Sequence, residues 1–311
     1  MPLADAEHFV RAPDWTWYIL FYFFLAGLSG GSYFIAALLR LFGKPQDEGA
    51  ARVGFYVAFP AFLICPVLLT LDLGQPVRFW HMLVNTTPDD QGLIFKYWSP
   101  MSVGAWVLVI FGAFATVSFV EALVRDGRLA FLAWAVRPLN GFLGKLWVVV
   151  GAVLGLFIAG YTGVLLAVSN QPIWSDTWAL GGLFLASGLT GSAALLAWLV
   201  HRRSDARGSA DIFTRMDRIF PVLELALILV FLLLLISPGT LTKTLAFPWI
   251  LLWVVALVGL LPGLAGLVRS RLSVSPDGAV AAVSTRAVAW AAVVVLLGVL
   301  ALRAAVIFSA Q

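Results

Sequence analysis

The sequence predicts an all-α integral membrane protein, and three observations support this fold class. Of its 311 residues, 61% are hydrophobic and 12% are charged, whereas soluble domains have roughly 25% charged residues. The apolar residues form continuous runs that reach the length of about 20 residues that a helix needs to cross a bilayer. These runs are too long, and alternate too little between apolar and polar residues, for the strands of a membrane β-barrel.

Eight runs meet the length requirement, and no long linker or low-complexity stretch divides them. We therefore treat residues 1–311 as one polytopic membrane domain. The residues before the first run lack the basic start and short apolar core of a signal peptide, so we expect the first run to be retained as a span. The predicted spans are Trp15–Leu41, Arg52–Leu73, Pro100–Leu123, Lys145–Val168, Trp178–Val200, Phe220–Ile236, Pro248–Leu267 and Val283–Val306.

The Lys and Arg residues are distributed unevenly between the two sides of these spans. The N-terminal side carries five of the 20, and the opposite side carries fifteen. Because cytoplasmic connections are enriched in Lys and Arg, we expect both termini and the connection Asp72–Ser102 to face outward. The net charge of +4 is spread over short connections, which is not the basic patch of a nucleic-acid-binding protein.

The cysteine and histidine content restricts the redox chemistry of the chain. Cys65 is the single cysteine, which excludes an internal disulfide, a thiolate zinc site and an iron–sulfur cluster held by this chain alone. The three histidines are His8, His81 and His201, and none lies in the middle of a span. A transmembrane cytochrome b needs paired histidines inside the bilayer, so we expect no haem and no metal bound by this chain.

The connection Asp72–Ser102 concentrates polar residues at the outer boundary. It contains Asp72, Arg78, His81 and Lys96. One interpretation is an ion pair between Asp72 and Arg78 that fixes the connection. The other is proton exchange with the outer aqueous phase, which suits an acid and a histidine that titrates near neutral pH. Ser99 before Pro100 is typical of a helix N-cap.

Two spans carry small residues that suggest close contacts. The first contains Gly27-Leu-Ser-Gly-Gly-Ser32, which predicts either helix packing or a thin wall for a flat ligand. In the fourth, Tyr161 lies about two turns below the outer boundary, between Gly160 and Gly163. A phenol in hydrocarbon needs a hydrogen-bond partner, and a backbone carbonyl or a bound ligand would provide one.

Three ionisable residues inside spans are functional candidates because burying a charge in lipid is costly. Glu121 and Glu224 lie toward the inner ends of the third and sixth spans. They are either structural acids neutralised by arginines such as Arg125 and Arg218, or parts of a candidate proton route from the cytoplasm. Arg303 in the last span either reaches the surface or balances a carboxylate.

Four segments together resemble the NrfD/polysulfide-reductase membrane-subunit (PsrC-like) family, and the resemblance covers nearly the whole sequence. They are Gly30-Gly31, Asp72-Leu-Gly-Gln-Pro-Val-Arg78-Phe79, Ser99-Pro-Met-Ser-Val-Gly-Ala-Trp106 and Gly160-Tyr161-Thr-Gly-Val. The resemblance implies a haem-free subunit of a respiratory oxidoreductase in a prokaryotic cytoplasmic membrane. Such a subunit exchanges electrons between menaquinone or ubiquinone and a peripheral iron–sulfur subunit, which connects to a molybdopterin enzyme or a multihaem cytochrome.

The resemblance also implies where the quinone binds. Tyr161 matches the quinone-binding tyrosine of the family, and Tyr22 stands where some members have a histidine before the paired glycines. We expect two adjoining four-helix bundles, with the quinone-binding half at about 1–170 and the second bundle at about 171–311. The residues Gln171–Asp176 are expected to help dock the partner.

The expected site has residues in two roles. Tyr161, Asp72 and His81 would handle protons and the hydrogen bond to the ring, and Arg78 would hold Asp72 charged. The quinone-binding residues would be Tyr161, Tyr22, Gly30, Arg78 and Lys96. Two alternatives remain open: a secondary transporter or proton-translocating protein without a quinone site, and a membrane anchor in which Tyr161 only packs.

Overall fold

The computed structural model describes residues 13–89, 91–272 and 285–311, and most of them are helical. The predicted start of the last span, Val283, and the N-terminal segment before residue 13 lie outside the described residues. The long helices are α1 (Trp17–Phe42), α2 (Glu48–Asp72), α3 (Pro100–Arg125), α5 (Phe142–Ala167), α6 (Leu180–Arg202), α7 (Ala210–Leu234), α9 (Trp249–Leu272) and α10 (Thr285–Ser309).

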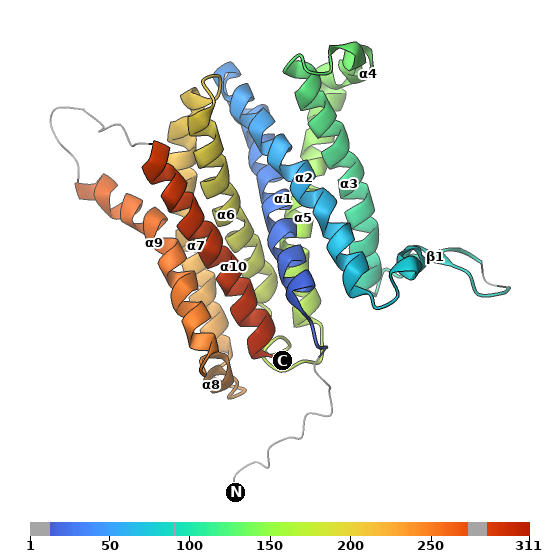
Figure 1. Cartoon of the computed structure of the whole chain (residues 1–311), viewed down its shortest axis with the longest axis vertical. Helices are drawn as coiled ribbons and strands as arrows, with labels where there is room; N and C mark the ends of the chain where they lie inside the picture. The colour runs from blue at the N-terminus through green and yellow to red at the C-terminus, as the bar shows by residue number, and fades with distance from the viewer. Residues whose placement is uncertain (1–12, 90, 273–284) are drawn as a thin grey trace, which may run out of the picture.

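Short elements connect the long helices. The α-helical ones are α4 (Ala133–Val136) and α8 (Leu241–Thr244), and the 3₁₀ turns are η1 (Pro45–Asp47), η2 (Pro76–Met82), η3 (Ala130–Leu132), η4 (Arg137–Asn140) and η5 (Arg207–Ser209). Strand β1 (Val84–Asn85) pairs antiparallel with β2 (Gly92–Leu93), and Val84 lies opposite Leu93. This β-hairpin extends sideways from the helices (Figure 1).

Within the described residues, seven helices are long and apolar enough to cross a membrane. They match seven of the eight predicted spans, so the prediction of a multi-pass, mainly α-helical membrane protein is confirmed, apart from the number of spans. The eighth predicted span, Phe220–Ile236, falls in α7, which is not one of the seven. This helix carries Asp217, Arg218 and Glu224 in its middle.

The long helices pack as two adjoining groups (Figure 1). Helices α1, α2, α3 and α5 form one, and α6, α7, α9 and α10 form the other. Helix α1 lies at the junction, where it contacts α5 and α6 as well as α2 and α10. Its small residues make this possible: a Cβ on Gly30 would collide with the carbonyl of Gly155 in α5, and one on Gly31 with Ser192 in α6. Of the two interpretations of Gly27–Ser32, close helix packing is therefore the one that agrees with the structure.

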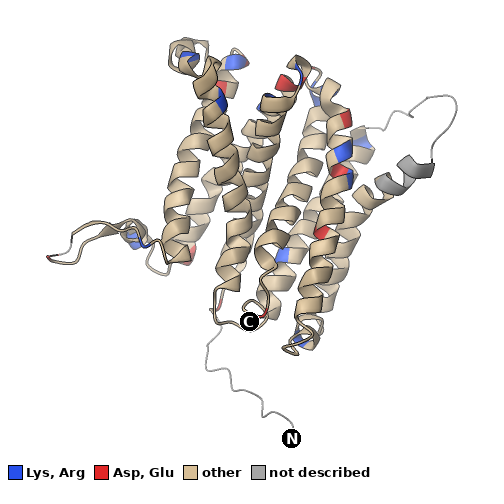
Figure 2. Ribbon diagram, turned by 180° about the vertical axis from the view of Figure 1, so that it is seen from behind, with Lys and Arg blue, Asp and Glu red and all other residues tan. Residues whose placement is uncertain are grey.

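Charged residues gather mainly at one end of the helices, as Figure 2 shows. We call this end, where Arg40, Arg125 and Arg203 lie, the basic end. The opposite end is the hairpin end, which carries the hairpin, the start of α3 and the C-terminal Gln311. There, Ser99 caps α3 by accepting a hydrogen bond from the Ser102 amide (3.4 Å), as predicted.

Candidate functional site

A groove of about 500 Å³ opens at the hairpin end between α3, α5 and α6. Its lining is mostly apolar, and many of its side chains are aromatic. The lining residues are Tyr97, Trp98, Pro100, Val103, Leu156, Phe157, Gly160, Tyr161, Val164, Trp178, Gly181, Gly182 and Leu185. Tyr97, Trp98 and Trp178 are 76%, 67% and 75% exposed, so their rings form an accessible rim around a buried wall.

Tyr161 forms part of that wall and is held from two sides. Its hydroxyl donates a hydrogen bond of 2.8 Å to the carbonyl of Pro100, and its ring stacks on Phe157 with 5.5 Å between centroids. The ring also lies against Gly104 of α3, where any Cβ would overlap it. Tyr161 is only 7% exposed. The phenol is therefore oriented by α3 before any ligand binds.

Glycines allow α5 and α6 to approach each other beneath the groove. A Cβ on Gly160 would lie 3.3 Å from the carbonyl oxygen of Gly181, and one on Gly163 would collide with the carbonyl of Leu180. The sequence indicated a gap at both Gly160 and Gly163. Only Gly160 lines the groove, while Gly163 is used by the helix crossing.

The polar residues of the connection Asp72–Ser102 lie outside the groove lining. Asp72 is half-buried at the last turn of α2, whereas Arg78 and Lys96 are exposed. His81 lies in η2, with its Nε2 3.3 Å from the Thr86 hydroxyl. Across the described ranges, no ion pair joins Asp72 to Arg78, so Arg78 does not hold Asp72 in this conformation.

Tyr22 and Gly30 are both buried in α1, and neither lines the groove. Tyr22 is 4% exposed, and its ring packs against Phe23 with 5.4 Å between centroids. Gly30 faces the α5 backbone as described above. Tyr22 and Gly30 therefore contribute to the packing of α1 and not to the surface of the groove.

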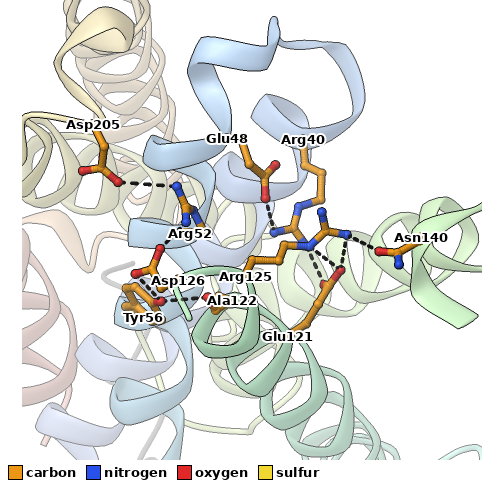
Figure 3. Close-up of polar contacts among 10 residues, drawn as sticks. All are labelled: Arg40, Glu48, Arg52, Tyr56, Glu121, Ala122, Arg125, Asp126, Asn140 and Asp205. Atoms are coloured by element: carbon orange, nitrogen blue, oxygen red, sulfur yellow. Dashed lines mark hydrogen bonds and ion pairs between the residues drawn. The ribbon is translucent and has the colours of Figure 1, made fainter. Parts of the chain in front are cut away.

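Glu121 belongs to an ion-pair network at the basic end, shown in Figure 3. Its carboxylate pairs with Arg40 (2.6 Å) and Arg125 (2.7 Å), and it is 3% exposed. Arg40 also pairs with Glu48 (2.8 Å). Arg125 was the predicted partner of Glu121, and Arg40 is a second partner that lies far away in the sequence.

Glu224 is 2% exposed and faces Ser187, Thr190 and Arg303 rather than Arg218, the expected partner. Its Oε2 atom has no hydrogen-bond partner among the described residues. Arg303 does not reach the surface, because its side chain is fully buried. Its guanidinium donates to the hydroxyl of Ser187 (2.8 Å) and to backbone carbonyls of Phe23 (3.2 Å) and Phe184 (3.1 Å).

The segment Gln171–Asp176 packs inside the protein. Gln171, Ile173 and Trp174 are buried, the Trp174 indole donates to the carbonyl of Val306 (2.8 Å), and its ring stacks on Trp15 with 5.1 Å between centroids. Ser175 is the exposed residue of this segment. The expectation that the segment docks a partner is therefore wrong for most of it, because its side chains fill the space between α1 and α10.

The sequence missed the rim of the groove. Trp98 and Trp178 were not among the expected site residues, yet both line the groove, as does Tyr97. Each precedes the start of a helix whose first turns form the groove, α3 or α6. The aromatic residues just before α3 and just before α6 could be seen in the sequence. Assigning them to one site, however, required knowing that both helices pack against α5.

Comparison with known families agrees with the resemblance. Residues 6–311 match the model of the family described as "Polysulphide reductase, NrfD". The chain belongs to the NrfD family. This NrfD-family protein is 28% identical over 227 residues to Protein NrfD of Escherichia coli, with 70% of each protein covered. It is 29% identical over 185 residues to the C polypeptide of polysulfide reductase from Wolinella succinogenes, and the match covers 57% of this protein and 55% of that relative.

A third relative of the NrfD-family protein is the C polypeptide of tetrathionate reductase from Salmonella typhimurium. The two are 28% identical over 162 residues, with 52% of this protein and 42% of the relative covered. The matches to the polysulfide and tetrathionate reductase polypeptides span about half the length of those relatives. The names of these two relatives describe them as parts of reductases.

Proposed function

We propose that this chain is the haem-free, quinone-interacting subunit of a respiratory oxidoreductase complex. It exchanges electrons between menaquinone or ubiquinone and a peripheral iron–sulfur subunit on the outer face. The observation that carries this proposal is the aromatic groove beside Tyr161, at the hairpin end of an NrfD-family protein.

The groove fits the chemistry of a quinone head group. Its walls are aromatic and aliphatic, which suits a flat ring, and Tyr161 provides a polar atom in an otherwise apolar surface. Sites for small ligands commonly combine apolar walls with a few placed polar groups. Tyr22 and Gly30 fall outside the proposed contact surface because they do not line it.

A bound quinone or quinol supplies the electron exchange, coupled to uptake or release of protons. The Tyr161 oxygen accepts a hydrogen bond from a ligand hydroxyl while its own O–H group continues to donate to the Pro100 carbonyl. To donate to a ligand carbonyl instead, the Tyr161 hydroxyl must leave Pro100. The Tyr161 hydroxyl would therefore accept a hydrogen bond from a quinol and donate one to a quinone.

Protons leave or enter at the hairpin end in this proposal. Asp72 and His81 are the proposed proton-exchanging residues between the end of α2 and the outer solution, and the exposed Arg78 and Lys96 are positively charged residues of the same connection. Partner docking is assigned to the exposed apolar side chains of the same connection, such as Phe79 (55% exposed) and Leu93 (76% exposed). The partner is an iron–sulfur subunit that connects to a molybdopterin or multihaem subunit.

The proposed orientation places the basic end in the cytoplasm of a prokaryotic cell and both termini outside, with all eight long helices crossing the membrane. The distribution of Lys and Arg supports it, with fifteen of 20 on one side. Helix α7 is included because Glu224, the charge nearest its apolar half, faces other protein groups rather than lipid.

A proton-translocating protein without a quinone site is the second candidate, and the Glu224–Arg303 arrangement favours it. Both oxygens of Glu121 are engaged by guanidinium groups, whereas Glu224 has an unpaired oxygen among the described residues. Of the two acids, Glu224 is thus the better candidate for moving protons in either function.

Purification from the native membrane separates these functions. The redox proposal predicts that the tagged protein copurifies with an iron–sulfur protein that has visible absorbance, and that solvent extraction of the assembly releases quinone. A protein that purifies alone in mild detergent, without quinone, contradicts the proposal and favours the second candidate.

A further inference from the structure

A second, smaller groove of about 300 Å³ lies at the basic end between α2 and α6. Its apolar side chains are Val53, Val57 and Leu199, and its polar side chains are Tyr56, Arg202 and Arg203. Helix α6 runs toward the basic end, so Arg202 and Arg203 follow Leu199 by about one turn. The groove therefore has an apolar floor toward the middle of the helices and cationic groups at its mouth.

Two of the nearby arginines are balanced by acids. Arg203 pairs with Asp126 (3.2 Å) and Asp205 (2.8 Å), and Arg52 pairs with the same two carboxylates (Figure 3). Tyr56 donates a hydrogen bond of 2.7 Å to Asp126, which fixes its ring in the groove wall. These two acids and two arginines therefore leave no net charge.

Two further arginines remain unbalanced. Arg202 and Arg128 are exposed, and neither forms an ion pair with any side chain that the structure describes. The Arg202 guanidinium lies 5.7 Å from the Trp198 ring centroid, and the Arg128 guanidinium lies 6.0 Å from the Tyr56 ring centroid. Arg202 itself lines the groove, and Arg128 lies over Tyr56, which also lines it. The aromatic rings hold both cations without neutralising their charge.

We propose that this groove binds an anionic phospholipid. Its phosphate is recognised by Arg202 and Arg128, and an acyl chain lies along Val57 and Leu199. Guanidinium groups bind phosphate oxygens in a planar, two-donor geometry, and basic pockets between membrane helices are suited to anionic headgroups. The uncompensated charge of the two arginines selects an anionic lipid over a zwitterionic lipid with the same chains.

The test uses the full-length protein, delipidated in a nonionic detergent and supplied with phosphatidylglycerol or phosphatidylcholine of identical acyl chains. Native mass spectrometry counts the lipids retained. We expect preferential retention of phosphatidylglycerol, and the double variant Arg202→Gln/Arg128→Gln should weaken it by about five-fold for each arginine. The control Arg137→Gln changes an exposed arginine at the same end and should leave retention unchanged.

A second variant separates charge from shape. Val57→Trp fills the apolar floor and keeps every charge, and it should also reduce retention. The proposal is overturned if the wild-type protein retains both lipids equally, or if either the double arginine variant or Val57→Trp keeps the full preference for phosphatidylglycerol. Soluble glycerophosphoglycerol should not compete, because it has no acyl chain; full competition by it would show a plain phosphate site instead.

Discussion

The hydroxyl of Tyr161 donates a 2.8 Å hydrogen bond to the backbone carbonyl of Pro100, the first residue of α3. This bond joins the C-terminal part of α5 to the start of α3 across the wall of the groove. The position of the phenol therefore depends on how closely α3 approaches α5, and that approach depends on Gly104.

Gly104→Ala should displace the Tyr161 ring, because the new Cβ would overlap it. Quinol-dependent turnover of the complex should fall by about ten-fold or more, since small misplacements of a positioning group have large effects on rate. The matched control is Gly266→Ala in α9, where the nearest atom of another element lies 4.0 Å from the added Cβ. Equal activity of the two variants would show that the Tyr161 position does not matter.

Glu121→Gln should destabilise the protein by about 3 kcal/mol, because it leaves Arg40 and Arg125 without their buried partner. Denaturant unfolding in detergent measures this change. Asp211→Asn, at an exposed position of α7, is the control and should have a small effect. A Glu121→Gln variant as stable as the control would mean that the network in Figure 3 contributes little to folding.

Arg303 and Glu224 should be energetically coupled. Each single change to Gln leaves the other group buried without its charge partner, so the double variant should be more stable than the sum of the two single effects predicts. Unfolding of the wild type, both single variants and the double variant gives the coupling energy. Additive effects would show that the two groups act independently.

Asp205 should contribute to stability only above acidic pH. The hydrogen bond from Arg203 lowers the pKa of Asp205 below its ordinary value of 3.8. Stability from this pair is therefore present above that value and is lost as the pH falls through the folded-state pKa. Asp205→Asn should lose up to about 1 kcal/mol at pH 7, because the carboxylate is partly exposed. The difference from wild type should shrink as the pH falls below 3.8, and a difference that stays constant as the carboxylate is titrated would contradict the assignment.

Trp174→Ala should reduce stability by about 3 kcal/mol or more, because it removes a buried indole, while a variant that still folds should bind its iron–sulfur partner normally. Trp98→Ala, at an exposed position on the groove rim, should show little loss of stability. Unfolding measurements and partner pull-downs distinguish the two. Loss of the partner by folded Trp174→Ala would restore a docking role for the segment Gln171–Asp176.

The sequence predicted the helices because their apolar runs are long and their caps are local. Ser99 next to Pro100 is enough to begin α3. The partners of buried charges were harder to predict. Arg125 lies one turn from Glu121 and was found, whereas Arg40 and Arg303 lie on other helices and depend on packing. The sequence analysis placed Trp174 in a segment expected to dock a partner. Its burial could not be foreseen, because it depends on contacts with Trp15 and with Val306 of α10, which lie far away in the sequence.

The candidate site was predictable in part for the same reason. Tyr161 and Gly160 were identified from the small residues that flank the phenol, and both line the groove. The rim residues Trp98 and Trp178 required the order of α3, α5 and α6 in space, which no local pattern contains.

The most direct test of the quinone site is Tyr161→Phe in the purified complex, compared with Tyr33→Phe. Tyr33 is another buried tyrosine, whose hydroxyl bonds to Ser118 (2.8 Å) at a distance from the groove lining. We expect Tyr161→Phe to weaken quinone-analogue binding and to lower quinol-coupled turnover by about ten-fold. Turnover of Tyr33→Phe, and electron transfer from artificial donors in both variants, should remain near wild type. Unchanged binding and turnover in Tyr161→Phe would show that Tyr161 does not contact the quinone.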